Sequence, residues 1–189
     1  RVVMAGRVKH INIFSVMPDL RAAKVLASVK DMRAESILGS TVGEFKKEGI
    51  EFAPSSLFLE EFIAKQGVLT KRAPTAEEEE DIALGFKVSK TLADLDVGLT
   101  CVVGNRAVVA LEGMEGTDLC IKRAGEIYAS SASAKAAAPV VVKVARSKQA
   151  DRYDLPVIGK GTLKAMIDAK ATTLAIEAGK RLCWIWSRL

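Results

Sequence analysis

The chain is short of the residue types that build several familiar kinds of active site. Its 189 residues include a single histidine, His10. Zinc sites with several histidines are therefore excluded, and a Ser-His-Asp triad is disfavoured because its base would have to be this residue. The three cysteines, Cys101, Cys120 and Cys183, are scattered without a CxxC pair. They fit small buried hydrophobic side chains in a reducing compartment better than disulfides or zinc ligands.

Aromatic residues and diagnostic motifs are also scarce. Aromatics make up only 5% of the chain, which leaves no platform for stacking nucleobases. No apolar run approaches the roughly 20 residues that a membrane-spanning helix needs. The motifs GxxxxGK(S/T), GxGxxG, HExxH and GxSxG are all missing. P-loop enzymes, dinucleotide dehydrogenases, zincins and α/β-hydrolases therefore have no motif support.

Charge is plentiful but dispersed. The formal net charge is +5, and lysines and arginines are spread along the chain instead of gathering in one block. This excess favours anionic ligands in general, and it does not single out DNA or RNA. A role in nucleic-acid binding is the least favoured interpretation.

Glycine, proline and charge patterns divide the chain. The stretch from Gln66 to Pro74 lacks apolar periodicity and predicts a boundary, with one domain over residues 1–66 and a second over residues 67–189. The chain opens directly on an apolar strand without Met and stops on the apolar residues 183–186. We therefore expect it to be an excerpt that is cut at both ends.

The first domain shows an alternation of strands and helices. Val2–Met4 predicts a strand leading into Gly6 and Arg7, where backbone N–H groups and a cation suit an anion, although such a turn alone is a weak signal. Asp19 is placed to cap a helix that runs to about residue 30. The further expected elements are a helix that ends at residues 46–49, a short strand over 50–52 and a short helix over 57–63.

The second domain begins with a strong helix signal. Thr75 and Glu78 form a capping box that opens an amphipathic helix to about Ala93. Gly104-Asn105 between two β-branched runs predicts a hairpin. The other expected elements are helices over 119–129 and 162–169, strands over 140–142, 172–176 and 181–185, and an exposed loop of small residues over 130–138.

The first candidate site lies between a strand and a helix. It consists of Glu112, Glu115, Gly116, Thr117 and Asp118. The glycine lets the backbone approach a ligand, the helix N-terminus favours an anion, and the carboxylates suit Mg²⁺ together with phosphate oxygens. An interpretation of equal weight is that Thr117 or Asp118 only caps its helix.

The second candidate site is the stretch Pro139–Gly159. Lys143 closes a buried strand, so its ammonium group is expected to emerge at the strand end. Arg152 would neutralise phosphate charge, and Asp154 would bind metal or orient water. A solvated loop is the alternative. A third candidate, Glu177 in the turn Glu177-Ala178-Gly179-Lys180, is more typical of a turn with a surface ion pair than of a site.

A set of short motifs lies in a fixed order over nearly the whole chain. In chain order they are Ala5-Gly6-Arg7-Val8, Pro18-Asp19, Gly67-Val68-Leu69-Thr70-Lys71-Arg72-Ala73-Pro74, Asp96-Val97-Gly98, Glu112 with Glu115-Gly116-Thr117-Asp118, Lys143-Val144-Ala145, Arg152-Tyr153-Asp154-Leu155-Pro156-Val157-Ile158-Gly159 and Glu177-Ala178-Gly179-Lys180. This ordered set resembles the LpxI type of UDP-2,3-diacylglucosamine pyrophosphatase.

The resemblance implies an α/β protein with the tail of a Rossmann-like N-terminal domain and a mixed α/β C-terminal catalytic domain. It implies hydrolysis of the pyrophosphate of UDP-2,3-diacylglucosamine to UMP and 2,3-diacylglucosamine 1-phosphate (lipid X), with Mg²⁺ or Mn²⁺, for lipid A synthesis. It also implies a cytoplasmic enzyme of a Gram-negative bacterium that meets the inner membrane surface through its lipid substrate. Homodimer formation is left open. A non-catalytic module that binds a nucleotide sugar or an anion is the alternative.

The resemblance also implies roles for particular residues. Asp154 is expected to be catalytic, and Asp118 and Asp154 to hold the metal. The residues expected to bind substrate are Gly6, Arg7, Gly116, Thr117, Lys143, Gln149, Arg152 and Glu177. The chain departs from the family pattern at Leu99, at Ala150 and around Ala34-Glu35. Each departure puts one secondary contact in question and leaves the expected fold unchanged.

Overall fold

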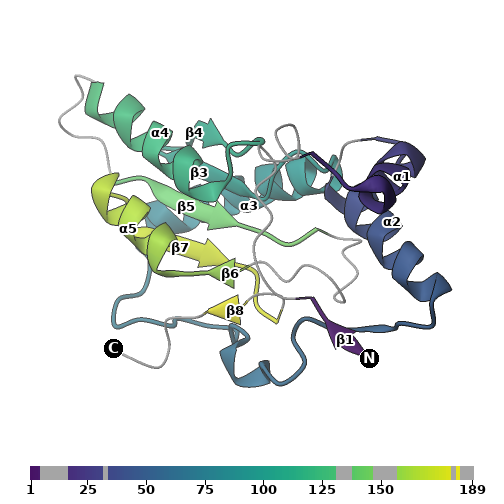
Figure 1. Cartoon of the computed structure of the whole chain (residues 1–189). Helices are drawn as coiled ribbons and strands as arrows, with labels where there is room; N and C mark the ends of the chain where they lie inside the picture. Colours follow the sequence, from purple (N-terminus) through teal and green to yellow (C-terminus); the bar gives the residue numbers. More distant parts are fainter. Residues whose placement is uncertain (5–16, 32–33, 131–137, 147–156, 180–181, 184–189) are drawn as a thin grey trace. The chain divides into compact units, whose positions relative to one another are not determined.

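The computed structural model describes residues 1–4, 17–31, 34–130, 138–146, 157–179 and 182–183 (Figure 1). The described residues divide into two compact units, one reaching Phe58 and the other starting at Leu59. Together they hold five α-helices and a four-stranded mixed sheet, which confirms a mixed α/β fold. Within the described residues no helix is long and apolar enough to cross a membrane.

The first unit contains two short parallel strands and two helices. Strand β1 (Val2–Val3) pairs with β2 (Phe52–Ala53), and α1 (Leu20–Ser28) and α2 (Ala34–Lys47) lie between them in sequence. The Asp19 side chain accepts a hydrogen bond of 2.7 Å from the Ala22 N–H, so the predicted N-cap is confirmed. Gly49, with φ of 75°, follows α2 in the left-handed conformation that glycine tolerates best. Local signals alone therefore located both helices of this unit.

The second unit carries the larger sheet, in the order β4-β3-β5-β7. Strand β3 pairs antiparallel with both β4 and β5, while β5 and β7 run parallel. A further short parallel pair joins β6 and β8. In chain order the elements are the 3-10 turn η2 (Glu60–Phe62), α3 (Ala76–Asp94), β3 (Thr100–Gly104), β4 (Ala107–Leu111), α4 (Thr117–Ser130), β5 (Val140–Lys143), β6 (Val157–Ile158), α5 (Lys160–Asp168), β7 (Thr173–Ile176) and β8 (Leu182–Cys183).

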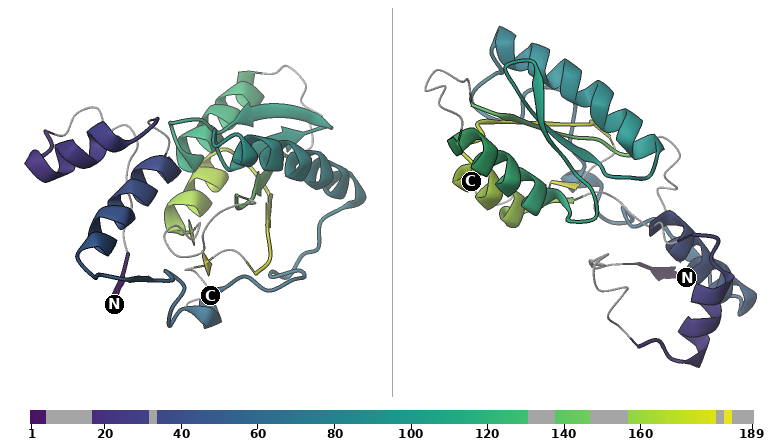
Figure 2. Two further views of the ribbon diagram at one scale, coloured as in Figure 1. Left: turned by 90° about the vertical axis from the view of Figure 1, so that its right-hand side faces the viewer. Right: turned by 90° about the horizontal axis from the view of Figure 1, so that it is seen from above.

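Helices cover both faces of the four-stranded sheet. On one face Val102 and Val141 pack against residues of α4 and α5, among them Ile121. On the other face Val140 and Val142 pack against α3. Figure 2 shows α3 on one side of the sheet and the pair α4 and α5 on the other. This arrangement explains the continuous apolar run of β5. A strand that is covered on both faces has no side towards water, so polar residues do not alternate with apolar ones.

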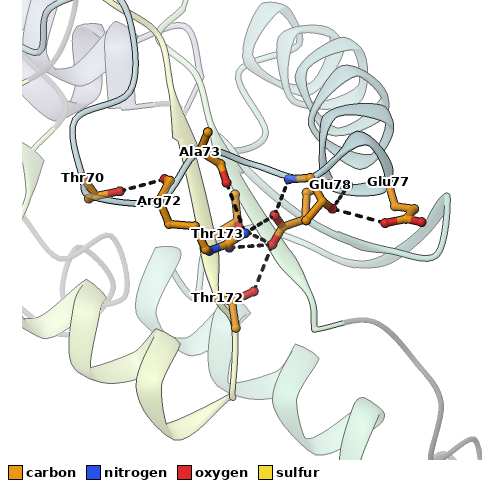
Figure 3. A network of polar contacts seen from close by, with 8 residues as sticks. Thr70, Arg72, Ala73, Glu77, Glu78, Thr172 and Thr173 are labelled. Carbon is orange, nitrogen blue, oxygen red and sulfur yellow. Dashed lines mark hydrogen bonds and ion pairs between the residues drawn. The ribbon is translucent and has the colours of Figure 1, made fainter.

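Helix α3 begins at the predicted capping box. The Thr75 hydroxyl accepts from the Glu78 N–H, and the Glu78 carboxylate accepts from the Thr75 N–H. Arg72 adds two hydrogen bonds of 2.7 and 2.8 Å to the same carboxylate. The hydroxyls of Thr172 and Thr173, at the start of β7, complete the set (Figure 3). We call these residues the Glu78 clamp; it ties the first turn of α3 to the start of the edge strand.

The β3–β4 hairpin turns at two residues with positive φ, Asn105 at 51° and Arg106 at 60°. This is the backbone of a type I′ turn, in which asparagine is favoured and arginine is unusual. Asp81 of α3 explains the exception, since its carboxylate accepts from the Arg106 N–H at 2.6 Å. The hairpin prediction is confirmed, and one long-range contact stabilises its less favourable residue.

Some predicted boundaries are wrong. The short helix expected over 57–63 is only the 3-10 turn η2, and the strand expected over 50–52 is displaced to Phe52–Ala53. Strand ends are set by pairing with β1, which the local sequence does not reveal. The strand expected over 181–185 is described only at Leu182–Cys183. Most of the expected loop of small residues lies outside the described part of the chain.

Candidate functional site

One end of the four-stranded sheet collects the polar residues that follow its strands. Lys143, the last residue of β5, lies opposite Thr100 at the start of β3 and opposite Ile176 at the end of β7. Glu112 and Glu177 come directly after β4 and β7. In open α/β sheets ligands bind beyond the carboxyl ends of parallel strands, and β5 and β7 are parallel. This end of the sheet is therefore the candidate site.

Lys143 is buried, with only 8% of its surface exposed. Its Nζ donates to Thr117 Oγ1 at 2.5 Å. The Thr117 hydroxyl in turn donates to Glu112 Oε1 at 3.1 Å and shares a contact of 3.3 Å with the Thr100 hydroxyl. The expectation that the ammonium group would emerge at the strand end is wrong. Because α4 covers that end of β5, the lysine instead joins a buried chain of polar groups through Thr117.

Glycine is needed at two points near Glu112, one in the loop before α4 and one in the connection before β3. Gly116 has a φ of 84°, and its carbonyl accepts the first helical hydrogen bond, from Cys120 N–H at 3.1 Å. Gly116 thus precedes the helix, and Thr117 and Asp118 lie in its first turn. A Cβ at Gly98 would lie 2.0 Å from the Glu112 carbonyl oxygen. That close approach allows the Leu99 N–H to donate to Glu112 Oε2 at 3.2 Å.

Two helices begin beside each other at this site. Asp118, in the first turn of α4, accepts a hydrogen bond of 2.9 Å from the Thr162 hydroxyl, in the first turn of α5. A Cβ at Gly161 would lie 3.2 Å from Asp118 Oδ2, so the glycine keeps space beside that oxygen. The N–H groups at the start of a helix and its dipole attract anions. Two such starts together form a place suited to a phosphate group.

Glu115 supports the loop from the outer side. Burial raises the pKa of the Glu115 carboxyl, but hydrogen bonds from Arg123 and from the Gly113 N–H outweigh it and leave this pKa below its usual value. The hydrogen bond to Glu115 raises the pKa of Arg123 in return. This carboxylate is thus ionised and occupied by two donors, at 2.5 and 2.9 Å. Its contacts are those of a residue that shapes the loop.

Two thiols lie beneath the site, as the composition predicted. Cys101 and Cys120 are fully buried. Burial raises the pKa of each to about 12, and for Cys120 the nearby carboxylate of Glu112 adds to the effect. Neither thiol is a nucleophile at neutral pH, because the thiolate is the reactive form.

Two family models match the chain in succession. The LpxI N-terminal domain matches residues 1–62, and the LpxI C-terminal domain matches residues 65–184. The chain belongs to the LpxI family. A curated relative is the "UDP-2,3-diacylglucosamine pyrophosphatase LpxI" of Caulobacter vibrioides (strain ATCC 19089 / CIP 103742 / CB 15). It is 31% identical over 185 residues, which cover 96% of this chain and 66% of the relative. The chain thus spans just under two thirds of the length of this LpxI protein.

The structure brings together five of the residues expected to form the LpxI site. Gly116, Thr117, Asp118, Lys143 and Glu177 all lie at the same end of the sheet. The other expected residues, Gly6, Arg7, Gln149, Arg152 and Asp154, lie outside the described residues. The roles assigned to all ten remain predictions.

Glu177 forms an ion pair that is largely buried. Its side chain is 16% exposed, and Oε2 lies 2.9 Å from Nζ of Lys90, which is 24% exposed. The turn itself is confirmed at Ala178 and Gly179. Lys90 was missed because it lies in the middle of a regular helix and carries no local signal. Thr162 was missed for a related reason, since only the approach of α4 to α5 gives it a partner.

Asp118 is the described site residue whose chemistry suits a divalent cation, because carboxylate oxygens are the hard ligands that Mg²⁺ prefers. A side chain at Gly161 would crowd its Oδ2, since a Cβ there would lie 3.2 Å away. Among the described residues no group of three or more metal-ligating side chains gathers. Mg²⁺ commonly takes one or two carboxylates and fills its other positions with phosphate oxygens and water, so the donor set fits this ion.

Proposed function

We propose that the protein hydrolyses the pyrophosphate bond of UDP-2,3-diacylglucosamine, with a divalent metal, to UMP and 2,3-diacylglucosamine 1-phosphate. The observation that carries this proposal is the end of the sheet where α4 and α5 both begin, next to Asp118 and above Lys143. Membership of the LpxI family supplies the substrate class. The name of the Caulobacter relative supports the same substrate.

In this proposal the described residues bind and orient the phosphates. The N–H groups in the first turns of α4 and α5 would face the negative charge. Lys143 contributes a positive charge from below, through Thr117, and needs no direct contact with the substrate. A fixed charge of this kind stabilises charge that develops on a phosphate without any rearrangement during the reaction.

Asp118 and Asp154 would hold Mg²⁺ or Mn²⁺, and Asp154 would also orient the attacking water. A bound divalent cation supplies Lewis-acid polarisation of the phosphate oxygens. The Thr162 hydroxyl donates to Asp118 Oδ1 and so favours one rotamer of this carboxylate. Thr162 would therefore act by orienting a metal-binding carboxylate.

The first unit is proposed to belong to a Rossmann-like domain. Its two strands are parallel and are connected through two helices, which is the connection that parallel strands require. The protein would act in the cytoplasm, at the membrane surface where its lipid substrate lies.

The test uses the full-length protein with UDP-2,3-diacylglucosamine and Mg²⁺ or Mn²⁺, and measures the release of UMP. Asp154→Asn should lower kcat by about a thousandfold or more, as removal of a catalytic group does. Asp118→Asn should raise the metal concentration needed for half-maximal rate. Asp168→Asn is the matched control, because Asp168 is an exposed aspartate of α5 that pairs with Lys164, and it should keep the wild-type rate.

Two results would contradict the proposal. Full activity of Asp154→Asn would remove its catalytic role, and an unchanged metal dependence of Asp118→Asn would remove its metal role. If the wild-type protein bound UDP without any turnover, and if neutralising both aspartates left that affinity unchanged, the protein would be a nucleotide-sugar-binding module instead.

A further inference from the structure

The pair Lys90 and Glu177 holds a piece of backbone in addition to holding its own charges. Lys90 Nζ lies 3.1 and 2.9 Å from the two carboxylate oxygens of Glu177. The same Nζ donates to the Ala145 carbonyl at 2.9 Å, and Glu177 Oε2 accepts from the Ala145 N–H at 3.0 Å. Both backbone polar groups of one residue are thus bound by the two members of one ion pair. We call these contacts the Lys90 clamp.

The residue that they hold is the second after the end of β5. A buried backbone group beyond a strand end has lost its ladder partner and must find another. Val144 still bonds to Leu99, and Ala145, which is 3% exposed, depends on the clamp. The next residue, Arg146, has Nε 2.6 Å from Oδ1 of Asp96. Three consecutive residues are therefore fixed as the chain leaves the sheet.

The clamp links the candidate site, to which Glu177 belongs, with Lys90 on a separate element. Lys143 is two residues before Ala145, and its contact with Thr117 depends on where β5 ends. Lys90 comes from α3, on the other face of the sheet from α4. Neither member of the ion pair needs to meet the substrate in order to influence Lys143. The backbone between residues 143 and 145 carries the effect.

We propose that Lys90 and Glu177 are a positioning pair, which fixes Ala145 and through it Lys143 and the direction of the chain beyond β5. This inference rests on the proposed function, and it changes the expected role of Glu177 from substrate contact to positioning. Charge-assisted hydrogen bonds are stronger and shorter than neutral ones, which suits a contact that must hold a backbone without a neighbouring strand.

The test compares four variants of the full-length protein with the wild type: Lys90→Met, Glu177→Gln, the double variant and Lys90→Arg. Each single neutral variant should lower kcat about tenfold with KM changed less than about twofold, since a displaced group loses orientation more than binding. The double variant should also lose about tenfold, because both residues act as one unit. Lys90→Arg keeps the charge and should recover most of kcat.

Glu78→Gln is the matched control, since it weakens the other polar attachment of α3 to β7. It should lower the melting temperature at least as much as Lys90→Met and leave kcat within twofold of the wild type. A drop in kcat that followed the melting temperature in all variants would overturn the proposal. A hundredfold loss in the double variant would do the same, because it would mean that Glu177 acts on the substrate independently of Lys90.

Amide hydrogen exchange separates this proposal from the proposed function. In the peptide that contains Ala145, Lys90→Met and Glu177→Gln should speed exchange at least tenfold, and Glu78→Gln should not. This result would support the clamp even if no UMP were released by the wild type. Unchanged exchange at Ala145 in both clamp variants would overturn the positioning role, whatever the enzyme assay showed.

Discussion

Helix α3 is attached to the edge strand β7 at two places, and the two attachments are built differently. At the start of β7, the Glu78 carboxylate receives donors from Arg72, Thr75, Thr172 and Thr173. Beyond the end of β7, Lys90 and Glu177 hold each other and the backbone of Ala145. The first attachment supplies hydrogen-bond donors to the buried carboxylate of Glu78. The second uses an ion pair to fix a third segment, the backbone that directly follows β5.

The electrostatics differ as well. The hydrogen bond from Arg72 is the largest of the effects that hold the pKa of Glu78 far below its usual value, against the opposing effect of burial. The carboxylate is ionised at any pH at which the protein works, so this end of α3 is permanently attached. A pair of charges therefore serves stability at the start of α3, while a similar pair near its end serves the proposed positioning of Ala145.

The largest effect is expected from a substitution that displaces α3 itself. Gly85 lies on α3 between Glu78 and Lys90, and a Cβ there would lie 2.5 Å from Cγ2 of the buried Val142. Gly85→Ala should cost about 3 kcal/mol in overpacking against this stiff side chain, offset by about 1 kcal/mol of helix propensity. The free energy of unfolding, measured with urea, should fall by about 2 kcal/mol, and both attachments should loosen together.

Gly39→Ala in α2 is the control for this change. Nothing lies within 4 Å of the position of its Cβ, so the substitution should stabilise the protein by up to about 1 kcal/mol. A Gly85→Ala variant that is as stable as the wild type would show that α3 has freedom to shift over the sheet.

Glu78→Gln weakens the attachment of α3 at the start of β7 and leaves the Lys90 clamp unchanged. It removes a charge that several donors share, and should lower the free energy of unfolding by about 1.5 kcal/mol. Glu79→Gln, at the exposed neighbouring acid, should change it by only a few tenths, about the value of a surface charge near a helix start. Equal effects of the two variants would mean that the Glu78 clamp adds nothing beyond the helix dipole.

The pH dependence of this difference has a definite sign. The pKa of Glu78 is lowered in the folded protein from an ordinary value of 4.5. The stabilisation that ionised Glu78 gives the folded protein is therefore complete above pH 4.5. It declines as the pH falls towards the lower pKa of Glu78 in the folded state. The difference in unfolding free energy between the wild type and Glu78→Gln should be constant from pH 6 to pH 8, and should shrink below pH 4.5.

Thr172→Val is expected to change the free energy of unfolding least. It tests how much each threonine hydroxyl contributes to the Glu78 clamp. The Thr172 hydroxyl lies 3.2 Å from Glu78 Oε1, a long hydrogen bond at an exposed residue. Its loss should cost about 0.5 kcal/mol in urea unfolding, against about 1 kcal/mol for Thr173→Val, whose hydroxyl lies 2.5 Å from the same oxygen. The reverse order would indicate that Thr172 holds the carboxylate and that Thr173 does not.

Local signals predicted much of this fold, and the reason is visible in particular residues. The capping box from Thr75 to Glu78 spans only four residues of sequence, and it appears as predicted. The hairpin at Asn105 and the burial of Val140–Val142 also follow from short patterns. By contrast, Lys90 and Glu177 are 87 residues apart, so only the folded sheet reveals them as partners.

The candidate site shows the same division. Strand ends and the glycine before α4 predicted where polar residues would gather. The burial of Lys143 could not be predicted, because it depends on α4 closing over the end of β5. Thr162 is the clearest case, since its hydroxyl has a role only after two helices have met.

The Glu78 clamp also bears on the order in which a growing chain completes its structure. Its carboxylate and the hydroxyls of Thr172 and Thr173 are 94 and 95 residues apart. While the ribosome is still adding the residues between them, Arg72 and the N-cap are the only partners of this set that the acid has. Strand β7 is also the last of the four sheet strands in chain order. The Glu78 clamp can therefore be completed only late in synthesis, after β7 has been made.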